Sequence, residues 1–223
     1  MPYYPILIDL QGKNVLVVGG GAVALRKIDT LLEHGARVHV IARVLTPALD
    51  TYVKEGRIKS LGQEFKDEAL DAFFLVIAAT DDRQLNHEIG TKAKAEGLLV
   101  NAVDQPSDCN FIVPSVLRRG DLLVAVSTSG KSPALARKVR KDLEGLFGDE
   151  YGHLLTLMGS IRSEVLSRGL SQEENRRIFY HIVDSPILDA LQRADWRKAA
   201  DILSGILHRE VSPDEVLESI KIE

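Results

Sequence analysis

The sequence predicts an α/β protein that begins with a parallel sheet, continues with a β-hairpin and one helix, and ends in an all-helical region. Short apolar runs alternate with helical periodicity over residues 13–102. Two strand-like runs joined by a short turn follow, and beyond residue 150 no strand-like alternation occurs. These changes predict three domains, at residues 1–112, 113–148 and 149–223.

The first domain is predicted from strands that are separated by helices. Residues 13–18 form a short apolar run, and the helix expected over 23–34 stops at Gly35, a natural C-cap. Further strands are expected at 37–42, 58–61, 73–78 and 98–102, with helices at 47–54 and 82–96. Strands that alternate with helices indicate βαβ units and hence a parallel sheet.

The pattern changes in the other two domains. Residues 111–117 and 122–127 flank the turn RRGD and predict a hairpin. The next helix has Ser132 as its N-cap, Pro133 at its first position and an apolar stripe that fits either a core or a partner subunit. That stripe consists of Leu135, Val139, Leu143 and Leu146. From Tyr151 onward the sequence is typical of helices.

Composition excludes several classes of protein. The single cysteine, Cys109, excludes a disulfide framework, and the six histidines lack the spacing of a zinc site, so no resident metal is predicted. No signal peptide or apolar run of membrane-spanning length is evident, which predicts a cytoplasmic protein. The net charge is −4, yet residues 112–148 carry +4. A local basic segment on an acidic chain suits an anionic ligand better than nucleic acid, although it also fits a solvated helix face.

A glycine turn follows the first strand and opens the first helix. Residues 19–24, GGGAVA, fit the pattern G-x-G-x-x-A. Gly19 would permit the tight turn, Gly21 would let the backbone approach a pyrophosphate, and Ala24 would allow close helix–strand packing. The N–H groups of Ala22 and Val23 would then face the phosphates. The turn thus predicts a Rossmann-type dinucleotide site; the alternative is a turn that only packs tightly.

Two further features of this sheet leave alternatives open. NAD sites usually carry an acidic residue at the end of the second strand, where this chain has Arg43 and Val44. Arg43 could neutralise the 2′-phosphate of NADP or lie along the adenine.

Two loops are predicted at the carboxyl edge of the sheet, at residues 78–82 and 101–106, and both should face the nicotinamide end of a dinucleotide. Thr80 and Asn101 are the expected contacts there. Asp104 is the carboxylate best placed to reach the cleft, and its alternative role is an Asx turn before Pro106.

Four stretches carry a resemblance to a known family: GGGAVALRK, VIAATDD, NAVDQPSDCNFIVPS and VAVSTSGKSPALARKVR. In this order and spacing they resemble the siroheme synthase family, and within it the precorrin-2 dehydrogenase module. The chain ends at Glu223, so a free-standing form without a methyltransferase domain is expected.

The resemblance implies a homodimer with a Rossmann domain, a central dimerisation segment (113–148) and a helical C-terminal domain. It implies oxidation of precorrin-2 to sirohydrochlorin with transfer of a hydride to NAD+. Some members also insert ferrous iron, so iron is a candidate second substrate. NAD is favoured over NADP despite Arg43, and the cofactor positions fall on Ala22, Val23, Arg43 and Val44. Asp104 takes the place of the family's essential aspartate, as a base or as a metal-orienting group.

The expected substrate explains the basic segment. Precorrin-2 carries eight carboxylates, and a loop in that segment offers hydroxyl and ammonium donors from Ser127, Thr128, Ser129 and Lys131. Two alternatives remain: a dimeric NAD(H)-sensing regulatory module without catalysis, and a dehydrogenase of another anionic substrate. The regulatory module would need the glycine turn but neither Asp104 nor the basic loop.

Overall fold

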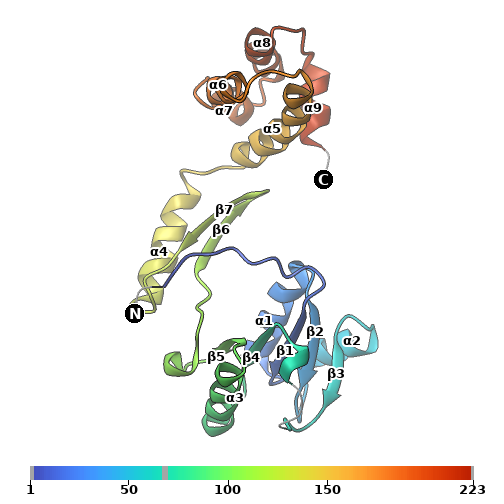
Figure 1. Ribbon diagram of the computed structural model, residues 1–223, viewed down its shortest axis with the longest axis vertical. Coiled ribbons are helices and arrows are strands. Elements are labelled where there is room, and N and C mark those ends of the chain that lie inside the picture. Colours follow the sequence, from blue (N-terminus) through green and yellow to red (C-terminus); the bar gives the residue numbers. More distant parts are fainter. Residues whose placement is uncertain (1–2, 67–69, 222–223) are drawn as a thin grey trace. The chain divides into compact units, whose positions relative to one another are not determined.

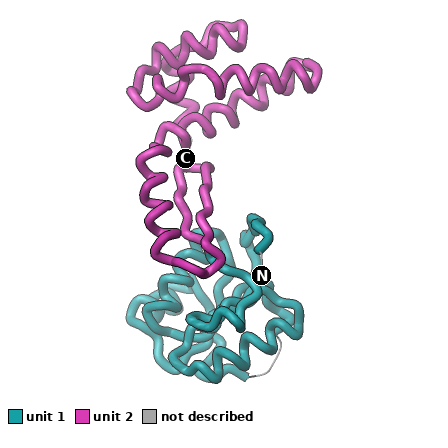
Figure 2. The backbone as a smooth tube through the Cα atoms, turned by 90° about the vertical axis from the view of Figure 1, so that its left-hand side faces the viewer, with its two compact units in different colours: residues 1–113 teal, residues 114–223 magenta. Residues whose placement is uncertain are grey.

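The computed structural model describes residues 3–66 and 70–221 of the chain. These residues divide into two compact units, 1–113 and 114–223 (Figure 2). The first unit holds the parallel sheet and its helices, and the second holds the hairpin and the remaining helices (Figure 1). The predicted fold class is confirmed.

The sheet of the first unit has five parallel strands in the order β3-β2-β1-β4-β5. Their bounds are β1 Asn14–Val18, β2 Arg37–Ile41, β3 Lys59–Gly62, β4 Leu75–Ala78 and β5 Leu99–Ala102. After β3 at one edge, the chain returns to form β4 beside β1, so the strand order reverses between β1 and β4. Ligands of such sheets bind outside the carboxyl ends of the strands at this reversal.

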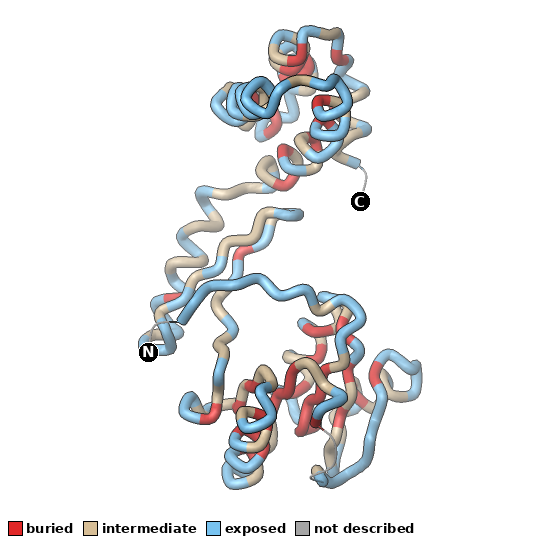
Figure 3. Tube along the Cα trace, in the orientation of Figure 1, coloured by how far each residue is buried: buried red, intermediate tan, exposed pale blue. Residues whose placement is uncertain are grey.

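Helices cover both faces of the sheet. Val15 and Val17 of β1 join one apolar cluster with α1 (Ala22–Glu33) and α2 (Pro47–Lys54). Leu16 and Val18 join the opposite cluster, with α3 (Arg83–Ala95) and the short helix η1 (Leu70–Ala72). Successive strand side chains point to opposite faces, so a sheet that is buried on both faces needs continuous apolar runs (Figure 3).

The second unit begins with the antiparallel pair β6 (Ser115–Arg119) and β7 (Leu122–Val126), on which α4 (Pro133–Glu144) packs. The hairpin turns at Gly120, whose φ is 53°. The strand predicted from residue 111 starts four residues later. Asn110 instead bonds to β5, where its Oδ1 accepts the N–H of Val100 at 2.8 Å, and Pro114 has no N–H for a ladder.

The remaining helices share one apolar core. They are α5 (Glu150–Ser167), α6 (Gln172–Val183), α7 (Ile187–Gln192), α8 (Trp196–Leu207) and α9 (Pro213–Ile220). On α4, Ser132 caps the helix by accepting the N–H of Leu135 at 3.2 Å, as the sequence indicates. Leu135 and Leu146 of the predicted stripe stay exposed. Across the described parts of the chain, every helix is too short or too polar to cross a membrane.

Candidate active site

The glycine turn lies at the reversal of the strand order. Gly19 has a φ of 127°, and a Cβ there would lie 2.2 Å from the carbonyl oxygen of Ala79, just beyond β4. A Cβ at Gly20 would lie 2.1 Å from the carbonyl oxygen of Val44, beyond β2. Glycine is therefore required at both positions for close backbone approach, and the turn is wedged between the ends of β2 and β4.

Gly21 differs from its two neighbours. Its φ is −84°, which any residue can adopt, and a Cβ there would meet no atom within 4 Å. Packing within the described residues therefore does not explain this glycine. Gly21 is also the N-cap of α1, and no side chain caps this helix start, which begins with Ala22 and Val23. An uncapped helix start with room for a ligand fits a pyrophosphate, as in dinucleotide sites.

Arg43 and Val44 are exposed to solvent beside the glycine turn. Val44 is 80% exposed, and the Arg43 side chain is 81% exposed. The N–H of Thr46 donates to the carbonyl oxygen of Gly20 at 2.9 Å, which fixes this segment against the turn. A guanidinium of Arg43 lies 3.6 Å from a carboxylate oxygen of Glu64.

Thr80 is held by the start of α3. Its hydroxyl lies 2.7 Å from Oδ1 of the buried Asn86 and accepts the N–H of Asp82 at 3.2 Å. Asp82 in turn caps α3 by accepting the N–H groups of Gln84 and Leu85. The Thr80 side chain thus shapes the loop after β4, and its predicted contact with a cofactor stays a prediction.

Asp104 occupies a strained position in the loop after β5. The N–H of Gln105 donates to the carbonyl oxygen of Ala102 at 3.3 Å and closes a four-residue turn, with Asp104 third in it. Its φ is 59°, in the left-handed region that aspartate tolerates better than most residues. The side chain is exposed, and no hydrogen bond or ion pair holds it within residues 3–66 and 70–221. An Asx turn onto Pro106 is not available, because proline has no N–H.

The loop that carries Asp104 is fastened along one face of α3. Gln105 donates to the carbonyl oxygen of Arg83 at 3.0 Å, and Nδ1 of His87 lies 3.0 Å from the carboxylate of the buried Asp108. One turn further, Gly90 leaves space for Asp108, and Lys94 donates to the carbonyl oxygen of Ser107. These four positions of α3 recur at helical spacing, so they lie on one face of the helix, and this face holds the loop along its length.

Asn101 and Cys109 close the base of the same loop. The Asn101 amide donates to the carbonyl oxygen of Phe111 at 3.2 Å, and the Cys109 thiol donates to that of Ala102 at 3.2 Å. Burial raises the pKa of the Cys109 thiol, so it stays protonated and acts as a donor. Because the N–H of Val103 donates to the carbonyl oxygen of Ala78, the loop is also fixed to β4, next to the glycine turn.

The four residues predicted to hold substrate share one loop of the second unit, between β7 and α4. Ser129 has a φ of 53°, and its N–H donates to the Ser127 hydroxyl at 3.1 Å. The Thr128 hydroxyl accepts the N–H of Ser132 at 3.1 Å. Two of the three predicted hydroxyls are therefore engaged by the loop's own backbone, while Lys131 is exposed.

Comparison with known proteins places this geometry in a family. Three models match in order along the chain: "Putative NAD(P)-binding" over residues 6–115, "Sirohaem biosynthesis protein central" over 119–146, and "Sirohaem synthase dimerisation region" over 150–207. The chain belongs to the siroheme synthase family. Its glycine turn and the Asp104 loop both lie in the region matched by the NAD(P)-binding model.

Individual relatives agree with this assignment. Siroheme synthase 1 of Serratia proteamaculans is 45% identical over 80% of this chain and 38% of its own length. The siroheme synthase of Gluconobacter oxydans is 38% identical over 96% of this chain and 46% of its own. The chain thus spans less than half the length of these curated relatives. The solved structure of SirC, a precorrin-2 dehydrogenase, has a TM-score of 0.77 and 27% identity, and covers 92% of this chain and 100% of SirC.

Sequence reasoning missed the residues that support the glycine turn and the Asp104 loop. Asn86, His87, Gly90 and Asp108 were not singled out, and neither was Glu64. The polar positions at helical spacing on α3 were the available signal, since a polar stripe beside a functional loop indicates anchoring. Glu64 had no such signal, because its pairing with Arg43 depends on which strands are neighbours.

Proposed function

We propose that this chain oxidises precorrin-2 to sirohydrochlorin and passes the hydride to NAD+. The observation that carries the proposal is the free carboxylate of Asp104, held by a firmly anchored loop at the edge where the glycine turn lies. It is supported by similarity to SirC, a precorrin-2 dehydrogenase, over nearly the whole chain.

In the proposed reaction, separate residues bind the cofactor and accept the proton. The N–H groups of Ala22 and Val23 bind the pyrophosphate, Gly21 leaves room for it, and Arg43 and Val44 flank the adenosine. The bound nicotinamide supplies the hydride acceptor. Loss of a hydride from the macrocycle must be matched by loss of a proton, and the Asp104 carboxylate accepts that proton. Thr80 and Asn101 shape the nicotinamide end.

In this proposal the carboxylates of the substrate are bound by the loop between β7 and α4. Lys131 and the hydroxyl of Ser129 are the donors that the loop leaves available, while Ser127 and Thr128 fix its shape. In this proposal the loop binds acetate and propionate arms by charge-assisted hydrogen bonds.

The proposal also covers the oligomeric state of the protein and its place in the cell. We infer a homodimer in the cytoplasm, with residues 113–148 as a dimerisation segment. Residues 150–207 match the family model described as the sirohaem synthase dimerisation region, so we extend the proposed contact to them. Light scattering on the intact chain measures the state, and a monomer at micromolar concentration contradicts the inference.

The decisive experiment supplies anaerobic precorrin-2 with NAD+ and follows the absorbance of sirohydrochlorin and of the reduced nicotinamide together. Equal appearance of both products is expected. If a dinucleotide binds but neither product forms, the proposal is wrong and the regulatory alternative gains support. Addition of ferrous iron to the same assay tests whether iron serves as a second substrate, and siroheme formation is the readout.

A further inference from the structure

Glu64 lies just beyond β3, next to the end of β2, where dinucleotide sites usually carry an acidic residue. Ile41 of β2 pairs with Gly62 of β3, and the N–H of Ala42 donates to the carbonyl oxygen of Gly62 at 3.1 Å. Arg43 and Glu64 each follow this pair by two residues, just beyond the ends of these neighbouring parallel strands. Their charged groups therefore meet beyond the sheet edge, at 3.6 Å.

This pair lies beside the glycine turn. The carbonyl oxygen of Val44, the residue after Arg43, lies close to Gly20. The N–H of Thr46 donates a hydrogen bond to the carbonyl oxygen of Gly20. The end of the second strand is where dinucleotide sites place the carboxylate that binds the ribose hydroxyls. In this chain the second strand supplies Arg43 there, and the adjacent strand supplies the carboxylate.

We propose that Glu64 makes the site selective for NAD over NADP. The inference rests on the dinucleotide binding in the proposed function. The 2′-phosphate of NADP carries between one and two negative charges near neutral pH, so a carboxylate at this place repels it, whereas it accepts hydrogen bonds from the free ribose hydroxyls of NAD.

The charge of Glu64, rather than the strength of its ion pair, accounts for the selectivity. Both side chains are mostly exposed, at 81% for Arg43 and 66% for Glu64, and exposed pairs contribute little stability. A phosphate could therefore break the pair and recruit Arg43. It could not remove the neighbouring carboxylate, which is why Arg43 does not make this an NADP site.

Calorimetric titration of the full chain with NAD+ and with NADP+ tests the inference without any tetrapyrrole. The wild type should bind NAD+ more tightly, and Glu64→Gln should lower the ratio of the NADP+ to the NAD+ dissociation constant by about tenfold. Glu55→Gln is the matched control, because Glu55 forms a similar exposed pair with Arg57 at 3.9 Å. It should leave the ratio unchanged.

A double-mutant cycle separates the two charges. In an Arg43→Gln background, Glu64→Gln should still lower the ratio, since the carboxylate acts directly. No change in that background, equal changes with Glu55→Gln, or a wild-type preference for NADP+ each overturns the inference. Selective NAD+ binding without precorrin-2 oxidation would leave it standing while the proposed function fails. Binding of neither dinucleotide would end both.

Discussion

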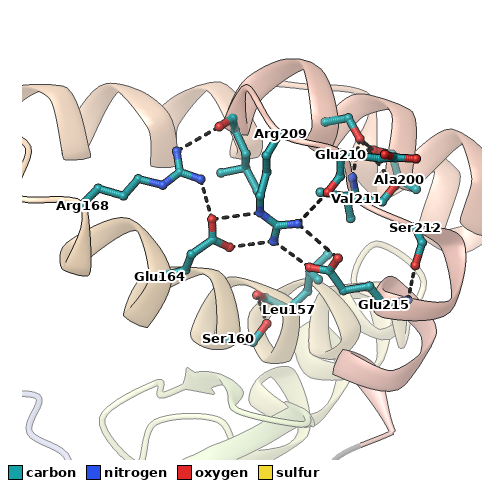
Figure 4. A network of polar contacts seen from close by, with 12 residues as sticks. Leu157, Ser160, Glu164, Arg168, Ala200, Arg209, Glu210, Val211, Ser212 and Glu215 are labelled. Atoms are coloured by element: carbon teal, nitrogen blue, oxygen red, sulfur yellow. Dashed lines mark hydrogen bonds and ion pairs between the residues drawn. The ribbon is translucent and has the colours of Figure 1, made fainter.

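Two carboxylates of this chain differ in how many partners hold them. Glu164 of α5 accepts two hydrogen bonds from Arg209, at 2.9 and 2.6 Å, and a further one from Arg168 (Figure 4). Arg209 also binds Glu215, so every charge in the cluster has a partner. Asp104, by contrast, is exposed and has no such bond within the described residues.

Under the proposed function, the difference separates a structural carboxylate, Glu164, from a catalytic base, Asp104. Hydrogen bonds from Arg209, with help from Arg168, lower the pKa of Glu164 to about 2, so it stays ionised and tied to its partners. The cluster connects α5 to α9, because Arg209 forms ion pairs with Glu164 of α5 and with Glu215 of α9. The loop of Asp104 is held by other residues, chiefly from α3, so under the proposed function its carboxylate is available to a substrate.

The largest expected effect is on catalysis at Asp104. Asp104→Asn keeps the size and the tolerance of a positive φ but removes the base, so the rate of precorrin-2 oxidation should fall by about 100- to 10,000-fold. The thermal unfolding midpoint should not change. Asp81→Asn is the control, since Asp81 is another exposed carboxylate in the loop after β4. A similar loss in both variants would show a general charge effect instead.

The next effect concerns the anchoring of the Asp104 loop. In Gly90→Ala the new Cβ would lie 2.9 Å from both the Cβ and the carbonyl oxygen of Asp108, so the loop must shift. A loss of about 1–3 kcal/mol in the free energy of unfolding is expected, together with a lower kcat.

Gly159→Ala is the matched control for that change. Gly159 also lies within a helix, and a Cβ there would meet nothing within 4 Å. It should stabilise the chain by about 0.5–1 kcal/mol. If Gly90→Ala is as harmless as Gly159→Ala, the loop is not anchored as described.

The Glu164 cluster should show the reverse pattern, with a loss of stability and no direct effect on chemistry. Glu164→Gln should cost about 1–2 kcal/mol, because charge-assisted bonds to Arg209 and Arg168 are weakened in a partly exposed site. Trp196, the sole tryptophan of the chain, lies in α8 and reports urea unfolding of this unit by its fluorescence. The rate per folded molecule should stay the same. A large loss of kcat would contradict the comparison.

Acidification tests the same carboxylate without a substitution. The folded-state pKa of Glu164 is about 2, below its usual value of 4.5, so its stabilising contribution is fully present above pH 4.5. It is lost as the pH falls from there toward 2. The difference in urea midpoint between wild type and Glu164→Gln should therefore narrow over this range, and a constant difference would contradict the low pKa.

The sequence predicted local features well and tertiary pairings poorly. The turn at Gly19 and the helix after it follow from spacing and periodicity, which act over a few residues. The strand expected from residue 111 was wrong at its start, because Asn110 bonds to β5 and Pro114 cannot join a ladder. The pairing of Arg43 with Glu64 depends on strand order, and no local pattern reveals strand order.

The smallest expected effect is at Ser129, which combines a strained backbone like that of Asp104 with a loop that is held by its own hydrogen bonds. Ser129 has a left-handed backbone like Asp104, with a φ of 53°, yet its loop is held by the hydroxyls of Ser127 and Thr128. Ser129→Gly removes the strain and adds chain entropy, so the free energy of unfolding should rise by no more than about 1 kcal/mol. If the Ser129 hydroxyl binds a substrate carboxylate, the KM for precorrin-2 should rise severalfold with kcat unchanged. An unchanged KM would place Ser129 with the structural residues and leave Lys131 as the loop's contact with substrate.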